Sequence, residues 1–247
     1  MFNKPWNGEQ DDFVIGADGA LSGVAKHCGV RDRKFFFTYQ EKVVMENAID
    51  PEMVELYFSE EFAPGMFAWL IPYDEHRAEL GLGCAQDKGN AGLFYKKFAA
   101  QFKIKEVKQV QSALIPVFDP RQRTVFGNKA LVGDAAGQVK ATTGGGIVFG
   151  WKCAEILADC VKKGKLEDYE RAWRKRYERD LKIHLLVRKF LDRVNYDKLL
   201  SLASENNLGA LVEQHGDMDH PKTLLKQMVK KPGLWLAGLK MPLLLKN

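Results

Sequence analysis

The segment between residues 131 and 150 constrains the fold of this chain more than any other part of the sequence. It reads Leu-Val-Gly-Asp-Ala-Ala-Gly-Gln-Val-Lys-Ala-Thr-Thr-Gly-Gly-Gly-Ile-Val-Phe-Gly. An apolar strand at 130–132 runs into Gly-Asp, crosses a loop of small residues and enters a helix through three glycines. The carboxylate can accept a hydrogen bond from a sugar or ribitol hydroxyl, and glycines let the backbone approach a ligand. The helix start directs unpaired N–H groups and partial positive charge at an anionic group, so the order favours a dinucleotide site.

A second segment, at residues 12–22, reads Asp-Phe-Val-Ile-Gly-Ala-Asp-Gly-Ala-Leu-Ser. It predicts a short buried strand that ends in a tight turn before a helix. Taken alone, it is a hairpin or a helix-cap turn in which Asp18 or Ser22 is the cap.

Together the two segments resemble the geranylgeranyl reductase family, whose members are FAD enzymes built like the aromatic hydroxylases. The chain carries GADG-x-x-S at 16–22 and GDAAG at 133–137, in the family's order. The resemblance implies that the first segment lies near the FAD pyrophosphate, that Asp134 bonds the ribitol, and that Gly145 and Gly146 lie against the flavin ring. Many relatives have proline where Ala141 stands, so this loop is expected to be less rigid. The residues assigned to FAD in this way are Asp18, Gly19, Gly133, Asp134, Ala135, Gly137, Gly144, Gly145, Gly146 and Ile147.

Residues 63–72, Ala-Pro-Gly-Met-Phe-Ala-Trp-Leu-Ile-Pro, resemble the family motif Y-x-W-x-F-P. Phe67 replaces the tyrosine and Ile71 the phenylalanine. The family uses this strand to line an isoprenoid tunnel, which makes Phe67, Trp69, Ile71 and Pro72 the expected substrate-binding residues. Read without the resemblance, Phe67, Trp69 and Ile71 are the inward face of a strand with a period of two. The two interpretations are compatible, because a lipid tunnel is a core with a channel through it.

A dinucleotide fold normally opens with strand, G-x-G-x-x-G and helix, and this sequence contains no G-x-G-x-x-G. A βαβ unit needs about 30 residues, whereas 11 residues precede the strand predicted from Asp12. We therefore expect the carboxyl-side part of a truncated or split enzyme. The expected partners are an N-terminal FAD-binding half or an electron donor, besides the isoprenoid lipid substrate.

The remaining pattern predicts a mixed α/β (α+β) chain with a partial FAD-binding fold of the aromatic-hydroxylase type. Successive strands at 33–46, 53–59, 66–72 and 77–84 with short connections predict an antiparallel sheet. A helix is expected at 92–102, further strands at 107–117 and 124–126, and helices within 167–194. The expected domains are an FAD-binding remnant (1–31), an antiparallel substrate-binding domain (32–118), an FAD-binding segment (119–163) and a C-terminal helical region (164–247).

Composition sets few limits on function. The 247 residues carry a net charge of +5 and 46% hydrophobic residues, as in soluble globular proteins. The four cysteines lack disulfide or zinc spacing and the five histidines form no cluster, so we expect a reducing cytoplasmic compartment, no metal and no nucleic acid. The basic tail from Asp217, with Trp235, suits a membrane interface or a helix packed on its own domain. Peripheral contact with the inner face of a membrane is therefore one expectation.

The resemblance implies reduction of isolated C=C bonds in the geranylgeranyl chains of membrane lipids, by hydride from reduced FAD plus a proton. Such chemistry needs an apolar pocket that excludes water. Catalytic residues are not assigned: Cys84, His76 and Tyr73 lie in or near the sheet, and a donor in the N-terminal half is an equal candidate. The alternatives are a flavin-dependent monooxygenase of the same fold, or a catalytically silent fragment or accessory subunit that needs an N-terminal partner.

Overall fold

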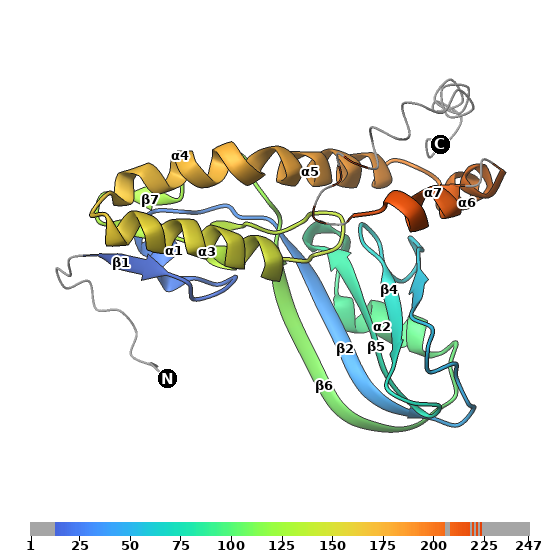
Figure 1. Cartoon of the computed structure of the whole chain (residues 1–247). Helices are drawn as coiled ribbons and strands as arrows, with labels where there is room; N and C mark the ends of the chain where they lie inside the picture. Colours follow the sequence, from blue (N-terminus) through green and yellow to red (C-terminus); the bar gives the residue numbers. More distant parts are fainter. Residues whose placement is uncertain (1–12, 206–207, 218, 220, 222, 224–247) are drawn as a thin grey trace. The chain divides into compact units, whose positions relative to one another are not determined.

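The structure, a computed structural model, describes residues 13–205, 208–217, 219, 221 and 223. The chain divides into two compact units (Figure 1). Unit 1 is formed by residues 1–31 and 118–247, and unit 2 by residues 32–117. The mixed α/β class with an antiparallel sheet is confirmed.

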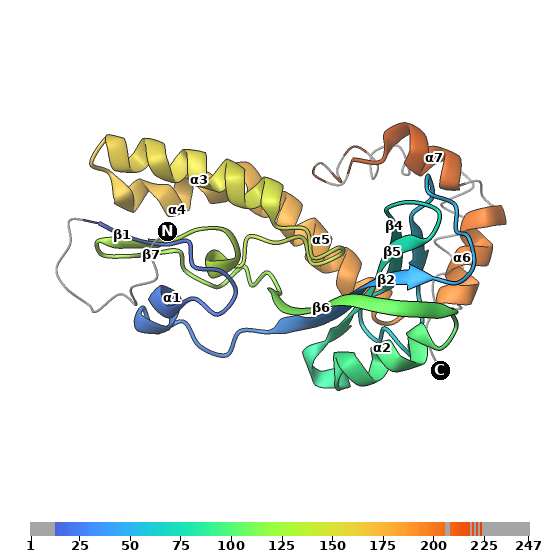
Figure 2. The same cartoon turned by 90° about the horizontal axis from the view of Figure 1, so that it is seen from below.

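Unit 2 is a five-stranded antiparallel sheet with one helix on its face (Figure 2). The strand order is β3-β4-β5-β2-β6. The strands are β2 (Phe35–Met45), β3 (Glu55–Tyr57), β4 (Ala68–Pro72), β5 (Arg77–Ala85) and β6 (Ile104–Pro116), and the helix is α2 (Ala91–Ala99). A 3-10 turn, Gln86–Lys88, connects β5 to α2, which begins at the N-cap Asn90.

The two faces of this sheet differ in side-chain size. On β5, Leu80, Leu82 and Cys84 are fully buried in a core shared with Tyr95 and Phe98 of α2. The alternate positions, Gly81 and Gly83, therefore lie on the opposite face. One face is thus a packed core, and the other carries small residues on its central strand.

Strand β4 shows the same division, and it corrects one expectation. Ala68 and Leu70 are buried in the core with α2, whereas Trp69 and Ile71 are half-buried on the opposite face. The expectation that Phe67, Trp69 and Ile71 form the inward face is therefore wrong. The alternation correctly predicts which residues share a face. The face that packs beneath α2, however, is the one with the smaller residues, Ala68 and Leu70.

Unit 1 contains a three-stranded sheet, order β1-β8-β7, in which β1 and β8 are parallel. Its strands are β1 (Val14–Gly16), β7 (Val125–Phe126) and β8 (Lys129–Leu131). Its helices are α1 (Gly23–His27), α3 (Ile147–Lys162), α4 (Tyr169–Trp173), α5 (Arg179–Leu191), α6 (Tyr196–Glu205) and α7 (Leu208–His215). Two 3-10 turns, Gly133–Ala136 and Leu166–Asp168, and a π-helical turn, Arg174–Glu178, complete it.

Strand β8 separates two cores in unit 1. Ala130 belongs to the cluster formed with α3 and α4, whereas Leu131 packs with Val24 and Ala25 of α1. Cys153 and Cys160 are buried on α3, as expected. This arrangement holds the end of β8 between helices on both sides.

No helix in the described part of the chain is both long and apolar enough to cross a membrane. The tail that suits a membrane interface, including Trp235, lies outside the described residues. The same holds for the strand start expected at Asp12.

Candidate cofactor-binding site

Two of the predicted cofactor segments leave the sheet at the same edge. Gly16 of β1 pairs with Leu131 of β8 in parallel, and the N–H of Val132 donates to the Gly16 carbonyl. The turns that follow, 16–22 and 133–137, therefore begin side by side. Ligands of α/β sheets bind at the carboxyl ends of their strands. This register brings together segments that are more than 100 residues apart in the sequence.

The GDAAG turn, residues 133–137, depends on left-handed glycines and on a buried glutamine. Gly133 has φ +65° and Gly137 has φ +69°, conformations that favour glycine. Gln138 is fully buried, accepts the Gly133 N–H at 2.8 Å and donates to the Tyr169 hydroxyl at 3.0 Å. Burial raises the pKa of Tyr169, so its hydroxyl stays protonated. Sequence reasoning missed Gln138, because a lone glutamine usually lies in solvent.

The next segment closes on itself to form what we call the glycine turn, residues 140–146. The Lys140 N–H donates to the Gly145 carbonyl at 3.0 Å, and the Gly144 N–H donates to the Lys140 carbonyl at 2.9 Å. Gly144 has φ +73°, and Gly146 is the N-cap of α3. The helix therefore begins at Ile147, which is 89% exposed.

The space beside two of these glycines is filled by the chain's own side chains. A Cβ added at Gly145 would lie 2.8 Å from Lys140 Cε, and one added at Gly146 would lie 2.8 Å from Asp134 Oδ1. Both distances are too short for real Cβ contacts. Glycine at positions 145 and 146 is therefore explained by packing within the chain. The sequence analysis explained these glycines only by the approach of a ligand. The same contact places the Asp134 carboxylate beside the start of α3, where negative charge is favourable.

In the turn at 16–22, Asp18 and Ser22 both cap α1. The Asp18 carboxylate accepts the Gly23 N–H at 2.7 Å and the Ser22 hydroxyl at 2.5 Å, and Ser22 Oγ accepts the Ala25 N–H at 2.8 Å. The cap interpretation is confirmed. Gly19, with φ +80°, has open space where a Cβ would lie. The assignment of Asp18 and Gly19 to FAD stays a prediction.

Two side-chain contacts hold the glycine turn to distant parts of unit 1. Thr142 Oγ1 lies 2.7 Å from Nδ1 of His184 on α5, which is 4% exposed. Lys140 Nζ lies 2.8 Å from Asp219 Oδ1. Neither partner could be identified from the sequence, since both contacts join residues more than 40 positions apart.

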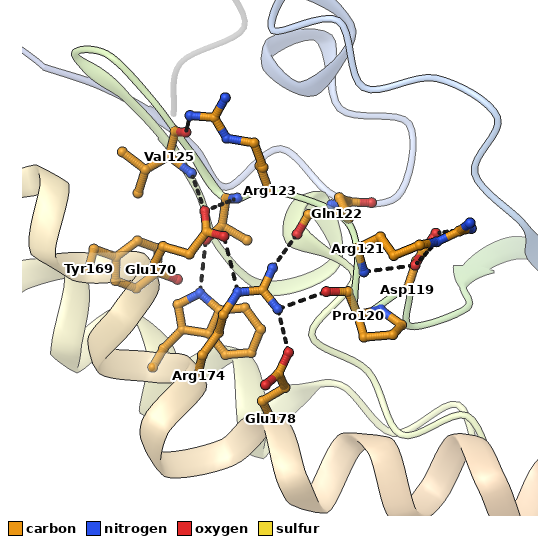
Figure 3. A network of polar contacts seen from close by, with 12 residues as sticks. Asp119, Pro120, Arg121, Gln122, Arg123, Val125, Tyr169, Glu170, Arg174 and Glu178 are labelled. Carbon is orange, nitrogen blue, oxygen red and sulfur yellow. Dashed lines mark hydrogen bonds and ion pairs between the residues drawn. The ribbon is translucent and has the colours of Figure 1, made fainter.

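A larger polar network joins α4 and the π-helical turn to the strand region before β8 (Figure 3). Glu170 accepts the Thr124 N–H at 2.7 Å and the Arg174 guanidinium at 3.0 Å. Arg174 also donates to Glu178 and to the carbonyls of Pro120 and Gln122. Because β7 pairs with β8, this network fixes the strand from which the GDAAG turn leaves.

In unit 2, Trp69 and Ile71 of the predicted substrate residues lie on the face of the sheet opposite α2, whereas Pro72, at the end of β4, alternates to the side of Ala68 and Leu70. The Trp69 ring lies across Gly81, where an added Cβ would meet ring carbons at 2.6 Å. Phe67 contacts Trp69 edge-on, with ring centroids 5.9 Å apart. Ile71 is half-buried on the same strand, which ends at Pro72. Gly81 on β5 therefore makes room for the indole, and we call Phe67 and Trp69 the aromatic layer.

Of the three candidate proton donors, one is buried on the other face of the sheet and two are exposed. Cys84 is buried on the α2 face, where burial raises the pKa of its thiol to about 11. Tyr73 is 52% exposed and donates to Glu79. His76 is exposed in the turn before β5. The structure thus separates Cys84 from Trp69 and gives the other two solvent-exposed positions.

Comparisons with known proteins show which family the chain resembles. Residues 35–117 match the family described as "Geranylgeranyl reductase catalytic domain". The digeranylgeranylglycerophospholipid reductase of Methanocaldococcus jannaschii is 30% identical over 240 residues, covering 90% of this chain and 60% of the relative. The geranylgeranyl diphosphate reductase of Synechocystis is 32% identical over 230 residues, covering 85% and 54%. The chain spans 60% or less of the length of these two relatives.

Solved structures agree on the fold. A geranylgeranyl bacteriochlorophyll reductase-like protein from Thermoplasma acidophilum has a TM-score of 0.74 at 20% identity, covering 96% of this chain and 64% of that one. HpxO of Klebsiella pneumoniae, solved with FAD and uric acid, has a TM-score of 0.54 at 18% identity, covering 88% and 60%. The expected relation to flavin enzymes of this fold is confirmed at the level of architecture.

Proposed function

We propose, from the chain's membership of the geranylgeranyl reductase family, that it binds FAD and reduces isolated C=C bonds in the geranylgeranyl chains of membrane lipids. The observation that carries the proposal is the parallel register of β1 and β8, which starts two cofactor segments at one sheet edge. The sheet of unit 2, which matches the family's catalytic domain, supplies the substrate side.

The residues at the edge fit a flavin dinucleotide. The glycine turn brings the start of α3 next to the Asp134 carboxylate, so an acceptor for ribitol hydroxyls stands beside a helix N-terminus. The N-terminus of α3 attracts negative charge, which suits the pyrimidine edge of a reduced flavin. When bound, FAD would supply the hydride. The chain's own part is to hold the cofactor and to fix the charges around it.

The aromatic layer of unit 2 supports an apolar substrate. Phe67 and Ile71 replace two residues of the family motif without adding a polar group, Trp69 keeps its tryptophan, and Gly81 leaves room for the indole. An isolated alkene develops positive charge at its more substituted carbon during reduction, so water must be excluded from the reacting bond. These side chains would exclude it. We assign no proton donor on this sheet, because Cys84 lies on the other face.

We further propose that an N-terminal FAD-binding half, in the same chain or in a partner, supplies the phosphate cradle. The sequence of 247 residues contains no G-x-G-x-x-G, and the curated relatives are longer. The net charge of +5 and the basic tail support peripheral contact with an anionic membrane surface, where a lipid substrate would be met.

The visible absorption spectrum of the purified chain, alone and mixed with a matching N-terminal half, tests the cofactor proposal. We expect flavin bands in at least one preparation, and absence from both overturns the proposal. Asp134→Ala should weaken FAD binding about ten- to hundredfold, since a hydrogen bond to a charged group contributes about 1.5–3 kcal/mol. Asp87→Ala, an exposed carboxylate of unit 2, is the matched control and should leave binding unchanged.

The activity is tested with the flavin-loaded preparation, dithionite and a digeranylgeranyl lipid under nitrogen. Mass spectrometry should find products that have gained one H₂ per reduced double bond. A product that instead contains oxygen, formed only in air, would identify the monooxygenase alternative. Flavin binding without either product would favour a silent or accessory role.

A further inference from the structure

Lys140 is the first residue of the glycine turn and is only 9% exposed. Its backbone closes the turn through hydrogen bonds to Gly144 and Gly145, and its side chain folds back across the same residues. A Cβ added at Gly145 would lie 3.3 Å from Lys140 Nζ. The ammonium group is therefore held one residue before the N-cap of α3.

An ammonium so close to a helix N-terminus meets the partial positive charge of the helix, and its burial removes much of its hydration. The carboxylate of Asp219 offsets this cost. Asp219 lies 2.8 Å from Lys140 Nζ, with side-chain exposures of 25% and 11%. Asp134 lies beside the next glycine, Gly146. The position of the charge is thus fixed by an ion pair as well as by packing.

We propose that the positive charge of Lys140, held in place by Asp219, raises the reduction potential of FAD bound at the glycine turn. The inference rests on the proposed function. Two-electron reduction adds negative charge to a flavin, so a fixed positive charge nearby stabilises the reduced form more than the oxidised form. Asp219 holds the ammonium in place and also partly neutralises it. An asparagine in its place can still accept the hydrogen bond from the ammonium but carries no charge.

The alternative is that Lys140 only fills the turn. Lys140→Met separates the two roles, since methionine keeps most of the unbranched side chain and removes the charge. Asp219→Asn keeps the size of the partner and leaves the ammonium less neutralised. A charge effect therefore gives the two variants potential shifts of opposite sign, whereas a filling role gives no shift or the same shift in both.

The experiment is a spectroscopic titration of the flavin potential against reference dyes, in whichever preparation carries FAD. We expect Lys140→Met to favour the oxidised form about tenfold, which for a two-electron couple is about 30 mV lower. Asp219→Asn should raise the potential. Lys140→Arg keeps the charge, so its flavin potential should stay close to that of the original protein. Lys162→Met is the distance control, because it removes the same charge at the far end of α3, about 20 Å away.

Each outcome decides the matter. Shifts of opposite sign, with no shift in Lys162→Met, support the proposal. An unchanged potential in Lys140→Met, or shifts of the same sign in both variants, overturns it while flavin binding upholds the proposed function. Absence of bound flavin in every preparation overturns both. If Lys140→Met does not fold, Asp219→Asn still tests the effect of the Lys140 charge, because Asp219 lies outside the turn. An unchanged or lowered potential in that variant overturns the inference.

Discussion

The imidazole of His184 lies with its Nδ1 2.7 Å from Oγ1 of Thr142, which ties α5 to the turn that starts α3. His184 is buried, and Thr142 stands between the GDAAG turn and the three glycines. The Lys140–Asp219 pair holds the same turn from another segment. Residues beyond α3 therefore belong to the candidate site, although the resemblance assigned none of them to it.

Replacing Thr142 by valine keeps the shape of the side chain and removes its hydroxyl. We expect a loss of about 1–3 kcal/mol in the free energy of unfolding, because the buried imidazole nitrogen loses its partner. FAD affinity should fall with it, since the turn is less constrained. Urea unfolding and flavin titration measure the two effects. Thr38→Val, on β2 in unit 2, is the control, and a fall in FAD affinity of equal size there would refute the explanation.

Gly146→Ala tests the crowding at the start of α3. The new Cβ would lie 2.8 Å from Asp134 Oδ1 and 3.1 Å from Val139 Cγ2, so the carboxylate must move. Overpacking of this kind costs about 1–3 kcal/mol, and we expect weaker FAD binding because Asp134 is displaced. Gly209→Ala in α7 meets no atom within 4 Å and should stabilise the protein by about 0.5–1 kcal/mol. Thermal unfolding of both variants gives the comparison, and equal stabilities would contradict it.

The sequence was sufficient for the features that depend on local patterns. Aromatic and β-branched residues bounded by turn residues predicted a strand at 33–46, and the structure has β2 at Phe35–Met45. Glycines with positive φ fall at Gly133, Gly137 and Gly144, where the motif has them. The helix was expected from about Gly145 and begins at Ile147, because Lys140 and Gly145 close a turn first.

What the sequence could not predict depends on contacts between distant residues. The alternation in β4 is compatible with either face being buried. Only the packing of α2 against the sheet places Ala68 and Leu70 in the core. A buried glutamine or histidine has the same local signature as a solvated one, so Gln138 and His184 could not be recognised. The central place of β2, between β5 and β6, also comes from pairings across long stretches of chain.

The network around Glu170 predicts that replacing Arg174 costs much more stability than replacing Arg171, three positions earlier. Arg174→Met removes a partner of Glu170 and Glu178 together with two carbonyl contacts, in a site where the side chain is 19% exposed (Figure 3). We expect a loss of about 2–4 kcal/mol, because Glu170 loses its cation and two carbonyls lose a donor, whereas Glu178 keeps its ion pair with Lys182. Arg171→Met breaks an ion pair with Asp168 whose arginine is 82% exposed, and should cost less than about 1 kcal/mol. Chemical denaturation of both variants measures the difference, and similar costs would show that the network is not integral to unit 1.

The cap of α1 predicts a pH-dependent contribution to stability. Burial raises the pKa of Asp18, but hydrogen bonds from the Ser22 hydroxyl and the Val24 and Gly23 N–H groups outweigh it, and the net pKa is lowered. The contribution is therefore present above the unfolded pKa of about 3.9 and is lost as the pH falls through the lower folded value. Because Asp18 is exposed, we expect no more than about 1 kcal/mol. Asp18→Asn should be less stable than the original protein at pH 6 and equal to it at low pH, and a constant difference would contradict this.

A substitution at the contact between Gly81 and Trp69 distinguishes an effect on substrate binding from an effect on cofactor binding. In Gly81→Ala the new Cβ would lie 2.6 Å from two ring carbons of Trp69, so the indole must leave its place on the face opposite α2. We expect unit 2 to lose about 1–3 kcal/mol of stability and lipid reduction to fall in kcat/KM. FAD affinity should not change, because the residues assigned to FAD all belong to unit 1. Ser112→Ala, at an exposed position of β6, is the control for a harmless change in the same sheet. Unchanged lipid turnover in Gly81→Ala would remove Trp69 from the substrate site, whereas a parallel loss of FAD would show that the variant disturbs more than the aromatic layer.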